Sequence, residues 1–282
     1  MEDDRGAKGE LAGERLAIGG RDFPLEAGPY VLGVLNLSPE SENADSVVPD
    51  VPAAIARARS LSSAGAHIID VGGRSTHFAA TPVSCRVERD RVVPAVEGLK
   101  AEGFLVSIDS WDARTVRAAL AAGADLVNDS GGFRSAAMIA AVAEGERPVI
   151  IPCLRGRSPP RSRAPGGSDP VATIARLLAR AVARAEAAGV RDAILDPGIG
   201  YAHWDLVDDE RRERLQRRVF SELGRLASLG RPLLAPVHRK RRRATTLELI
   251  RLAHRGGATF FRTHEPRLVY EALGLRAEQA RS

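Results

Sequence analysis

Polar residues follow short apolar runs at eight places along the chain, and their types are those that bind flat heterocycles and phosphates. Asp and Asn side chains pair with the donors and acceptors of a heterocyclic ring. Arg262, His264 and Lys240 supply positive charge for an anion such as phosphate, and the Asn36 amide oxygen suits a hard cation such as Mg²⁺. The pattern predicts a site for a heterocycle that carries phosphates. In chain order the polar positions are Asn36, Asp70 with Ser75 and Thr76, Asp109, Asn128 with Asp129, Arg155, Asp196, His238 with Arg239 and Lys240, and Arg262 with His264.

The apolar runs belong to one repeated local pattern. Ser63–Gly73, Ala121–Gly132, Ala187–Gly200 and Arg255–Glu265 each contain a glycine turn, four to six mostly apolar residues and a polar cluster. A glycine that ends a helix, followed by a strand buried on both faces, produces this order. The pattern predicts eight strands: Val31–Asn36, His67–Val71, Phe104–Ile108, Asp125–Asn128, Pro148–Pro152, Ala193–Leu195, Pro232–Pro236 and Thr259–Arg262. Helical patterns alternate with them: Val51–Ala64, Val87–Ala101, Ala113–Ala122, Ser135–Val142, Pro170–Ala188, Asp208–Leu229, Thr245–Arg255 and Glu265–Glu278.

Strands that alternate with helices predict a parallel sheet, and eight such units favour a closed (β/α)₈ barrel of the TIM type. A doubly wound open sheet is the alternative, but no GxGxxG follows the first strand, which argues against its dinucleotide-binding form. In a barrel the polar positions meet at the carboxyl ends of the strands. We expect residues 28–282 to form the barrel and residues 1–27 to form a tail and a cover for its bottom. The Pro/Gly/Arg/Ser-rich segment Arg157–Ser168 is expected to be a mobile loop.

Composition excludes several classes of protein. The chain has 282 residues, of which 44% are hydrophobic and 27% charged, as in a globular protein. The longest near-unbroken apolar run, Ala136–Ala143, is too short to span a bilayer, and the first ten residues lack the apolar stretch of a secretory signal. Two cysteines exclude a disulfide scaffold. These features predict a cytoplasmic protein without a membrane partner.

Lysine is rare in this chain, although the net charge is +5. Only three of the 41 basic residues are lysines, and the arginines are scattered beside acidic residues, as on a solvated face. With an aromatic content of 4% the chain also lacks stacking platforms for bases, so we expect no nucleic-acid partner. One of the three lysines, Lys240, follows the seventh predicted strand, at the expected site.

Seven motifs at the predicted strand ends resemble those of the dihydropteroate synthases, the folate-pathway branch of the pterin-binding barrel family. They are LGVLNLSP (32–39), IIDVGGRST (68–76), SIDSW (107–111), VND (127–129), LDPGIG (195–200), HRKR (238–241) and RTH (262–264). The resemblance implies a condensation in which 6-hydroxymethyl-7,8-dihydropterin diphosphate loses pyrophosphate and the amine of p-aminobenzoate attacks the resulting cation-like methylene. It also implies small-molecule partners only, Mg²⁺ as cofactor and a homodimer, for which the seventh and eighth helices are the expected interface.

The resemblance also implies roles for individual residues. Asp109, Asn128, Asp196 and Lys240 would hold the pterin ring, and Asn36, Thr76, Arg262 and His264 would bind the diphosphate. Asn36 would also be the metal ligand. The expected catalytic residues are Asp109, Lys240 and Asn36.

Two loops depart from the family pattern. Residues 38–46 read SPESENADS where the family has TPDSFSDGG, and residues 73–80 read GRSTHFAA where it has GESTRPGA. A third change places Tyr201-Ala202-His203 where Phe-Gly-Lys is usual. The departures leave a second hypothesis open, a paralogue that binds a pterin but uses another acceptor or none. A corrinoid-dependent methyltransferase domain is the weaker third, because it has no need for the pair Arg262 and His264.

Overall fold

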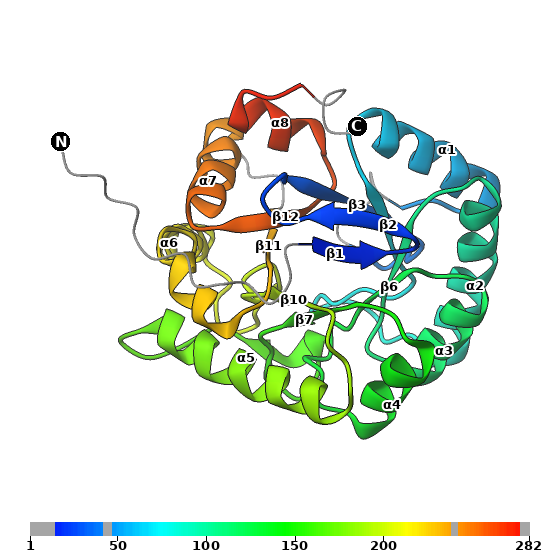
Figure 1. Ribbon diagram of the computed structural model, residues 1–282, viewed down its shortest axis with the longest axis horizontal. Coiled ribbons are helices and arrows are strands. Elements are labelled where there is room, and N and C mark those ends of the chain that lie inside the picture. Colours follow the sequence, from blue (N-terminus) through cyan, green and yellow to red (C-terminus); the bar gives the residue numbers. More distant parts are fainter. Residues whose placement is uncertain (1–14, 42–46, 238–241, 277–282) are drawn as a thin grey trace.

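Eight parallel strands close into a barrel in the computed structural model, which describes residues 15–41, 47–237 and 242–276. Parallel pairing of the last strand with the first, in which Arg262 lies opposite Leu32, closes the sheet and confirms the barrel over the open-sheet alternative. Figure 1 shows the strands surrounded by a ring of helices. In order around the barrel the strands are β3 (Tyr30–Asn36), β4 (Ile68–Gly72), β5 (Val106–Asp109), β6 (Leu126–Asn128), β7 (Val149–Pro152), β10 (Ala193–Asp196), β11 (Leu233–Pro236) and β12 (Ala258–Thr263).

The helices begin where the sequence provides caps. The side chains of Asp50, Ser84, Asp112, Asp169 and Asp208 each accept a hydrogen bond from a backbone N–H in the first turn. The helices are α1 (Val51–Ser63), α2 (Cys85–Ala101), α3 (Ala113–Ala121), α4 (Ala136–Gly145), α5 (Pro170–Ala187), α6 (Asp209–Ser221), α7 (Arg243–Arg255) and α8 (Arg267–Leu273).

Two predicted helices differ clearly from the observed ones. The segment predicted as one helix over Asp208–Leu229 is divided, because α6 ends at Ser221 and a 3₁₀ helix, η3, continues over Leu223–Leu229. The prediction that the last helix extends to Glu278 was wrong, because α8 ends at Leu273. Gly274 adopts a left-handed conformation with φ of 68°, which terminates that helix.

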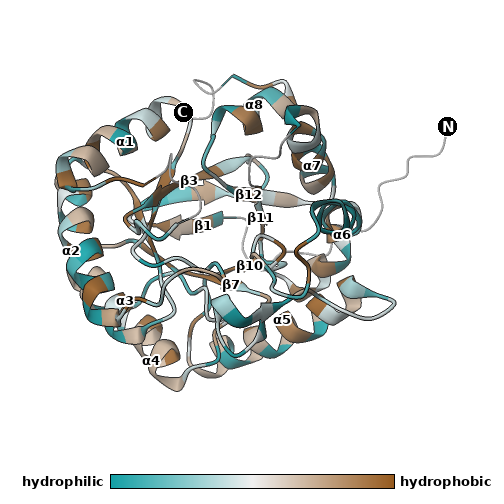
Figure 2. Ribbon diagram, turned by 180° about the vertical axis from the view of Figure 1, so that it is seen from behind, coloured by the Kyte–Doolittle hydropathy of each residue, from teal (hydrophilic) through white to brown (hydrophobic). Residues whose placement is uncertain are grey.

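A small hairpin packs against the amino-terminal ends of the barrel strands. It consists of β1 (Arg15–Ile18) and β2 (Arg21–Pro24), and Leu16, Ile18 and Phe23 join the apolar cluster that fills this end of the barrel. The turn requires Gly19, because its φ is +57° and an added Cβ would lie 2.5 Å from the Leu105 side chain. Figure 2, which views the barrel from the side opposite this hairpin, colours the ribbon by hydropathy and shows hydrophobic residues along the barrel strands. The polar strand ends lie at the opposite end of the barrel.

The segment after β7 differs from the loop expected there. A two-stranded antiparallel hairpin forms from β8 (Arg155–Gly156) and β9 (Ser162–Arg163), joined by the 3₁₀ turn η2 (Pro159–Arg161). Gly156 makes this tight connection possible, because its φ is +132° and a Cβ there would lie 2.1 Å from the Arg161 carbonyl oxygen. The hairpin segment contains few apolar residues, so the sequence pattern does not predict its strands.

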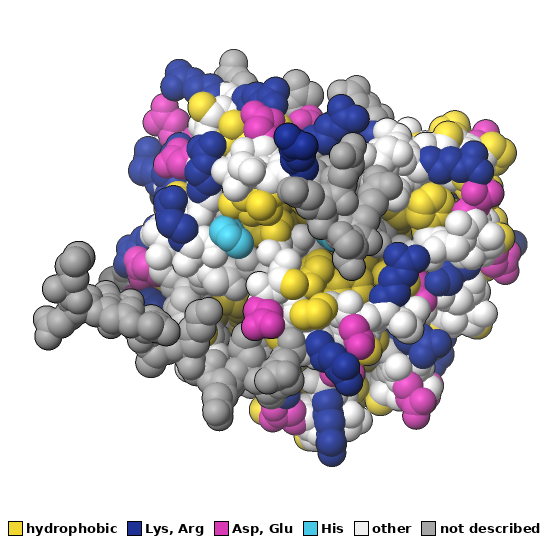
Figure 3. Space-filling view, turned by 45° about the horizontal axis from the view of Figure 1, so that its top comes forward, with side chains coloured by type: hydrophobic (Ala, Val, Ile, Leu, Met, Phe, Trp, Pro, Cys, Tyr) yellow, Lys and Arg dark blue, Asp and Glu magenta, His cyan; other side chains and the backbone are white. Residues whose placement is uncertain are grey.

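Surface arginines lie beside acidic residues, as Figure 3 shows for one face of the molecule. On α6, Arg214 pairs with Glu210 at 3.6 Å and Arg218 pairs with Glu222 at 3.4 Å, both one helical turn apart. No helix in the described residues combines the length and apolarity required to cross a bilayer.

Candidate active site

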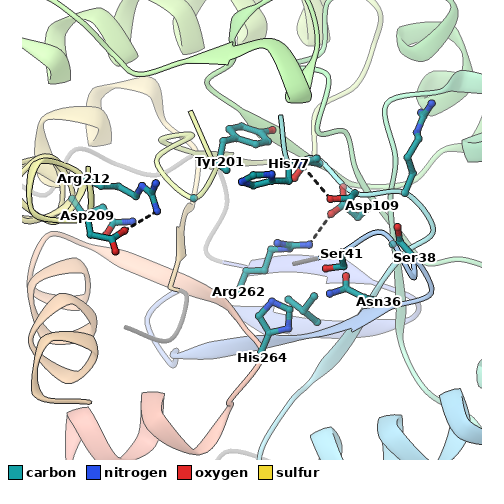
Figure 4. A pocket seen from close by; sticks show the side chains of 18 of the residues that line it. Asn36, Ser38, Ser41, His77, Asp109, Tyr201, Asp209, Arg212, Arg262 and His264 are labelled. Carbon is teal, nitrogen blue, oxygen red and sulfur yellow. Dashed lines mark hydrogen bonds and ion pairs between the residues drawn. The ribbon is translucent and has the colours of Figure 1, made fainter. Parts of the chain in front are cut away.

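Two adjoining pockets open at the carboxyl ends of the barrel strands, and Thr76, Asp109, Gly200, Tyr201 and Arg262 line both of them. The larger pocket, of about 320 Å³, reaches from the ends of β3 and β12 to the start of α6, and Figure 4 shows its side chains. The smaller pocket, of about 60 Å³, lies toward β6, β10 and β11 and adds Asn128, Ser130, Asp196 and Pro236.

The structure brings most of the predicted site residues together. Asn36, Thr76, Asp109, Arg262 and His264 line the larger pocket. The smaller pocket contains Asp109 with Asn128 and Asp196, the residues expected to hold a ring. Lys240, with His238 and Arg239, lies outside the described residues. Arg155 lines neither pocket, and its guanidinium instead donates to the Ala164 carbonyl oxygen within the segment after β7.

Arg262 joins two carboxylates at the centre of the site. Its Nε donates to Asp70 Oδ2 at 2.6 Å, and its Nη2 donates to Asp109 Oδ2 at 2.7 Å. The Asp70 side chain is fully buried and also accepts a hydrogen bond from Asn128 Nδ2 at 3.2 Å. Strands β4, β5, β6 and β12 thus contribute to one polar network, which only closure of the barrel assembles. A guanidinium is suited to this place because its planar fork serves two acceptors at once.

Burial raises the pKa of the two carboxyl groups that line the smaller pocket, those of Asp109 and Asp196. Desolvation raises the pKa of Asp109, and the Arg262 guanidinium opposes that shift. Desolvation raises the pKa of Asp196 to about 7, although its Oδ1 accepts a hydrogen bond from Gly198 N at 2.6 Å. Asp196 therefore titrates near neutral pH.

His264 differs from the cation that the sequence suggested. Burial, together with the nearby charges of Arg262 and Arg57, lowers the pKa of His264 to about 4. The imidazole is therefore neutral at neutral pH and would contribute to an anion site as an N–H donor. Among the described residues of the larger pocket, Arg74, Arg212 and Arg262 supply positive charge.

A divalent cation fits this rim only if the substrate supplies most of its ligands. Among the described residues, no three His, Cys, Asp or Glu side chains gather as a metal site. Gly72 leaves open space between two oxygens, since a Cβ there would lie 3.8 Å from Asn36 Oδ1 and 3.9 Å from Asp109 Oδ2. Mg²⁺ is commonly held by one or two protein oxygens together with substrate phosphates. The donors present fit that mode of binding.

The described residues of the two divergent loops include members of two ion pairs. Arg74 lies 3.6 Å over the Trp111 ring, and its Nη2 lies 3.1 Å from the fully buried carboxylate of Glu88. Glu40 accepts hydrogen bonds from both terminal nitrogens of Arg91, at 2.9 and 3.0 Å, and this contact lowers the pKa of Glu40 to about 2. Residues 42–46 lie outside the described residues.

Tyr201 and four residues of α6 are pocket residues that the sequence patterns did not single out as part of the site. The α6 residues are Asp209, Arg212, Glu213 and Gln216. Tyr201 lines both pockets, and its hydroxyl donates to the Ser130 carbonyl oxygen at 2.8 Å. The chain order could have indicated these residues, because Tyr201 directly follows the LDPGIG motif and α6 is the next helix.

Comparison with known proteins places this geometry in a family. The model of the family described as "Pterin binding enzyme" matches residues 32–264. A dihydropteroate synthase of Synechocystis sp. is 34% identical over 229 residues, covering 80% of this chain and 76% of that protein. The solved structure of Xanthomonas albilineans dihydropteroate synthase with 4-aminobenzoic acid superposes with a TM-score of 0.79 at 31% identity, covering 93% of this chain and 96% of the other. The same enzyme in complex with 7,8-dihydropteroate gives a TM-score of 0.75 at 29% identity, covering 92% and 96% of the two chains. The chain therefore belongs to the pterin-binding enzyme family, as a member of its dihydropteroate synthase branch.

Proposed function

We propose that this protein condenses 6-hydroxymethyl-7,8-dihydropterin diphosphate with p-aminobenzoate and releases pyrophosphate. The proposal rests on one observation: two pockets adjoin at Asp109 and Arg262. Side chains suited to a heterocyclic ring line the smaller pocket, and side chains suited to an anion line the larger one. The complexes of the Xanthomonas enzyme with 4-aminobenzoic acid and with 7,8-dihydropteroate support it.

In the proposed reaction the smaller pocket holds the pterin ring. Asp109 and Asp196 accept hydrogen bonds from its N–H groups, and Asn128 contributes a donor and an acceptor. Lys240, by resemblance, donates to ring acceptors and faces the second substrate. Negative carboxylates beside the ring stabilise the positive charge that develops on the methylene carbon as its C–O bond breaks.

The larger pocket holds the leaving group and admits the acceptor. Asn36, Thr76, Arg262 and His264 line it and would donate to or orient the diphosphate, which keeps the electron pair of the broken C–O bond. The amine lone pair of p-aminobenzoate forms the new C–N bond, and the nitrogen then loses a proton. Because an aniline nitrogen is already a nucleophile, no strong base is required. Mg²⁺, bound by Asn36 and the diphosphate, would offset the charge of the leaving group.

The second hypothesis, a pterin-binding paralogue with another acceptor or none, rests on the altered loops. A single experiment separates it from the proposed function. Purified protein is given the pterin diphosphate, Mg²⁺ and p-aminobenzoate, while dihydropteroate formation is followed and pterin binding is measured by calorimetry. We expect turnover; tight pterin binding without turnover would support the paralogue instead.

Pterin binding should depend on pH through Asp196. A carboxyl group with a pKa of about 7 must lose its proton before it can accept two N–H groups. Below pH 7 binding therefore releases a proton, and we expect the pterin Kd to rise by up to about tenfold per pH unit as pH falls. Calorimetry between about pH 6 and about pH 8, in buffers of different ionisation enthalpy, measures both the pterin Kd and the number of protons released on binding. Asp196→Asn should bind more weakly with a flatter pH profile; a wild-type Kd independent of pH would contradict this role.

We propose that residues 28–282 act as one catalytic barrel, that the protein is cytoplasmic, and that it forms a homodimer through α7 and α8. Sedimentation of the purified protein tests the dimer.

A further inference from the structure

The hairpin after β7 docks on the loop that follows β10, and a buried polar pair lies at the centre of the contact. Ser162 Oγ and His203 Nδ1 are 3.2 Å apart, and Ser162 and His203 are 0% and 2% exposed. The Trp204 backbone N–H also donates to the Ser162 carbonyl oxygen at 3.4 Å. Burial lowers the pKa of His203 to about 4, so this imidazole is neutral at neutral pH.

Contacts nearer the surface reinforce the pair. Asp205 accepts hydrogen bonds from the Ala164 backbone N–H at 2.8 Å and from Arg163 Nε at 3.3 Å. The Arg163 guanidinium also lies 5.0 Å from the centre of the Trp204 ring. Hairpin and loop are thus joined by backbone, charged and aromatic contacts around one buried hydrogen bond.

The same loop carries Tyr201 into the site. The His203 backbone N–H donates to the Tyr201 carbonyl oxygen at 3.1 Å, and the Tyr201 hydroxyl donates to the Ser130 carbonyl oxygen at 2.8 Å. On the other side, Gln216 Nε2 of α6 donates to the Ile199 carbonyl oxygen at 3.1 Å. Tyr201, His77 and Arg262 all line the larger pocket (Figure 4). Hydrogen bonds therefore hold Tyr201 at its hydroxyl and at its backbone carbonyl, and a further hydrogen bond holds the nearby residue Ile199.

We propose that Ser162 and His203 are positioning residues that hold Tyr201 in the wall shared by the two pockets, and so set how the acceptor approaches the pterin. This inference rests on the proposed function. It also connects two departures from the family pattern, because His203 and Tyr201 stand where Lys and Phe are usual and each gains a hydrogen bond here.

A matched pair of substitutions at His203 tests the contact. In His203→Asn the side-chain amide reaches the position of Nδ1 and can still bond Ser162 Oγ, whereas His203→Gln places its amide near Nε2, away from Ser162. We expect Ser162→Ala and His203→Gln to lower kcat/KM for p-aminobenzoate by about tenfold to a hundredfold, the effect of displacing a group by about 1 Å. His203→Asn should recover most of the loss. The pterin Kd should change by less than about threefold in every variant.

A second substitution shows whether the loss of kcat/KM in Ser162→Ala depends on the Tyr201 side chain. In a Tyr201→Ala background, Ser162→Ala should lower kcat/KM by less than about twofold, because the Tyr201 side chain that Ser162 positions is already absent. Equal losses for His203→Asn and His203→Gln, or a full additional loss in the Tyr201→Ala background, would overturn the proposal.

Amide hydrogen exchange of residues 199–206 provides a readout that needs no turnover. Exchange should accelerate in Ser162→Ala and His203→Gln but not in His203→Asn. If exchange follows this order while the wild-type protein forms no dihydropteroate, the proposed function fails and the contact itself stands. If the protein is active but exchange and kcat/KM are unchanged by Ser162→Ala, the positioning role fails and the function stands.

Discussion

Replacing Asp109 with asparagine is expected to lower kcat by about a thousandfold, the upper range for loss of one electrostatic contact to a transition state. Asp109 is the one acidic residue among the side chains that line both pockets in the described part of the chain. An amide has no charge to stabilise a cationic methylene carbon, and one of its two groups donates rather than accepts. Steady-state measurement of dihydropteroate formation at saturating substrate concentrations gives kcat.

Asp112→Asn is the matched control for this substitution. Asp112 lies three positions further along the chain and caps α3, where its side chain accepts from the backbone N–H groups of Arg114 and Thr115. Asparagine is an equally good cap, so activity and stability should not change. Undiminished turnover in Asp109→Asn, with the control also active, would remove Asp109 from the mechanism.

Replacing Arg262 with methionine is expected to cost about 3 to about 5 kcal/mol of unfolding free energy, because it leaves a buried carboxylate without its partner. Asp70 is fully buried and pairs with Arg262 at 2.6 Å. The same change removes the cation that holds Asp109 and faces the larger pocket, so turnover should also be lost. Urea unfolding measures the free energy, provided that the fitted slope is unchanged.

Arg217→Met is the surface comparison for this loss. Arg217 pairs with Glu248 at 3.1 Å, but the two side chains are 36% and 47% exposed, so removal should cost less than about 1 kcal/mol. Adding Asp70→Asn to Arg262→Met should recover part of the stability, because the unpaired charge is then gone, without restoring turnover. Equal costs for Arg262→Met and Arg217→Met would contradict the network at the barrel centre.

The barrel could be predicted from the sequence because each of its units repeats the same local physics. Glycine turns such as Gly65 and Gly123, both with positive φ, end a helix and introduce an apolar strand, and a polar residue follows. Parallel strands then place those polar residues at one end of the barrel, so Asn36, Asp109 and Arg262 could be assigned to one site from their positions in the chain.

The interactions between the strand ends could not be predicted in the same way. Asp70 and Arg262 are 192 positions apart, and only barrel closure determines that they form an ion pair. Whether His264 is charged depends on its burial, which composition does not reveal. The hairpin that contains Ser162 lacks an apolar pattern, and its fold depends on a glycine with φ of +132° and on a hydrogen bond to His203. Such contacts are set by tertiary packing.

The most direct test of the account is the stoichiometry of a single turnover. Enzyme in excess is mixed with the pterin diphosphate and Mg²⁺, with or without p-aminobenzoate, and pyrophosphate and dihydropteroate are both quantified. We expect equal amounts of the two products when p-aminobenzoate is present, and little pyrophosphate when it is absent. Pyrophosphate without dihydropteroate, or neither product despite saturated pterin binding, would contradict the proposal that these two pockets join a pterin to p-aminobenzoate.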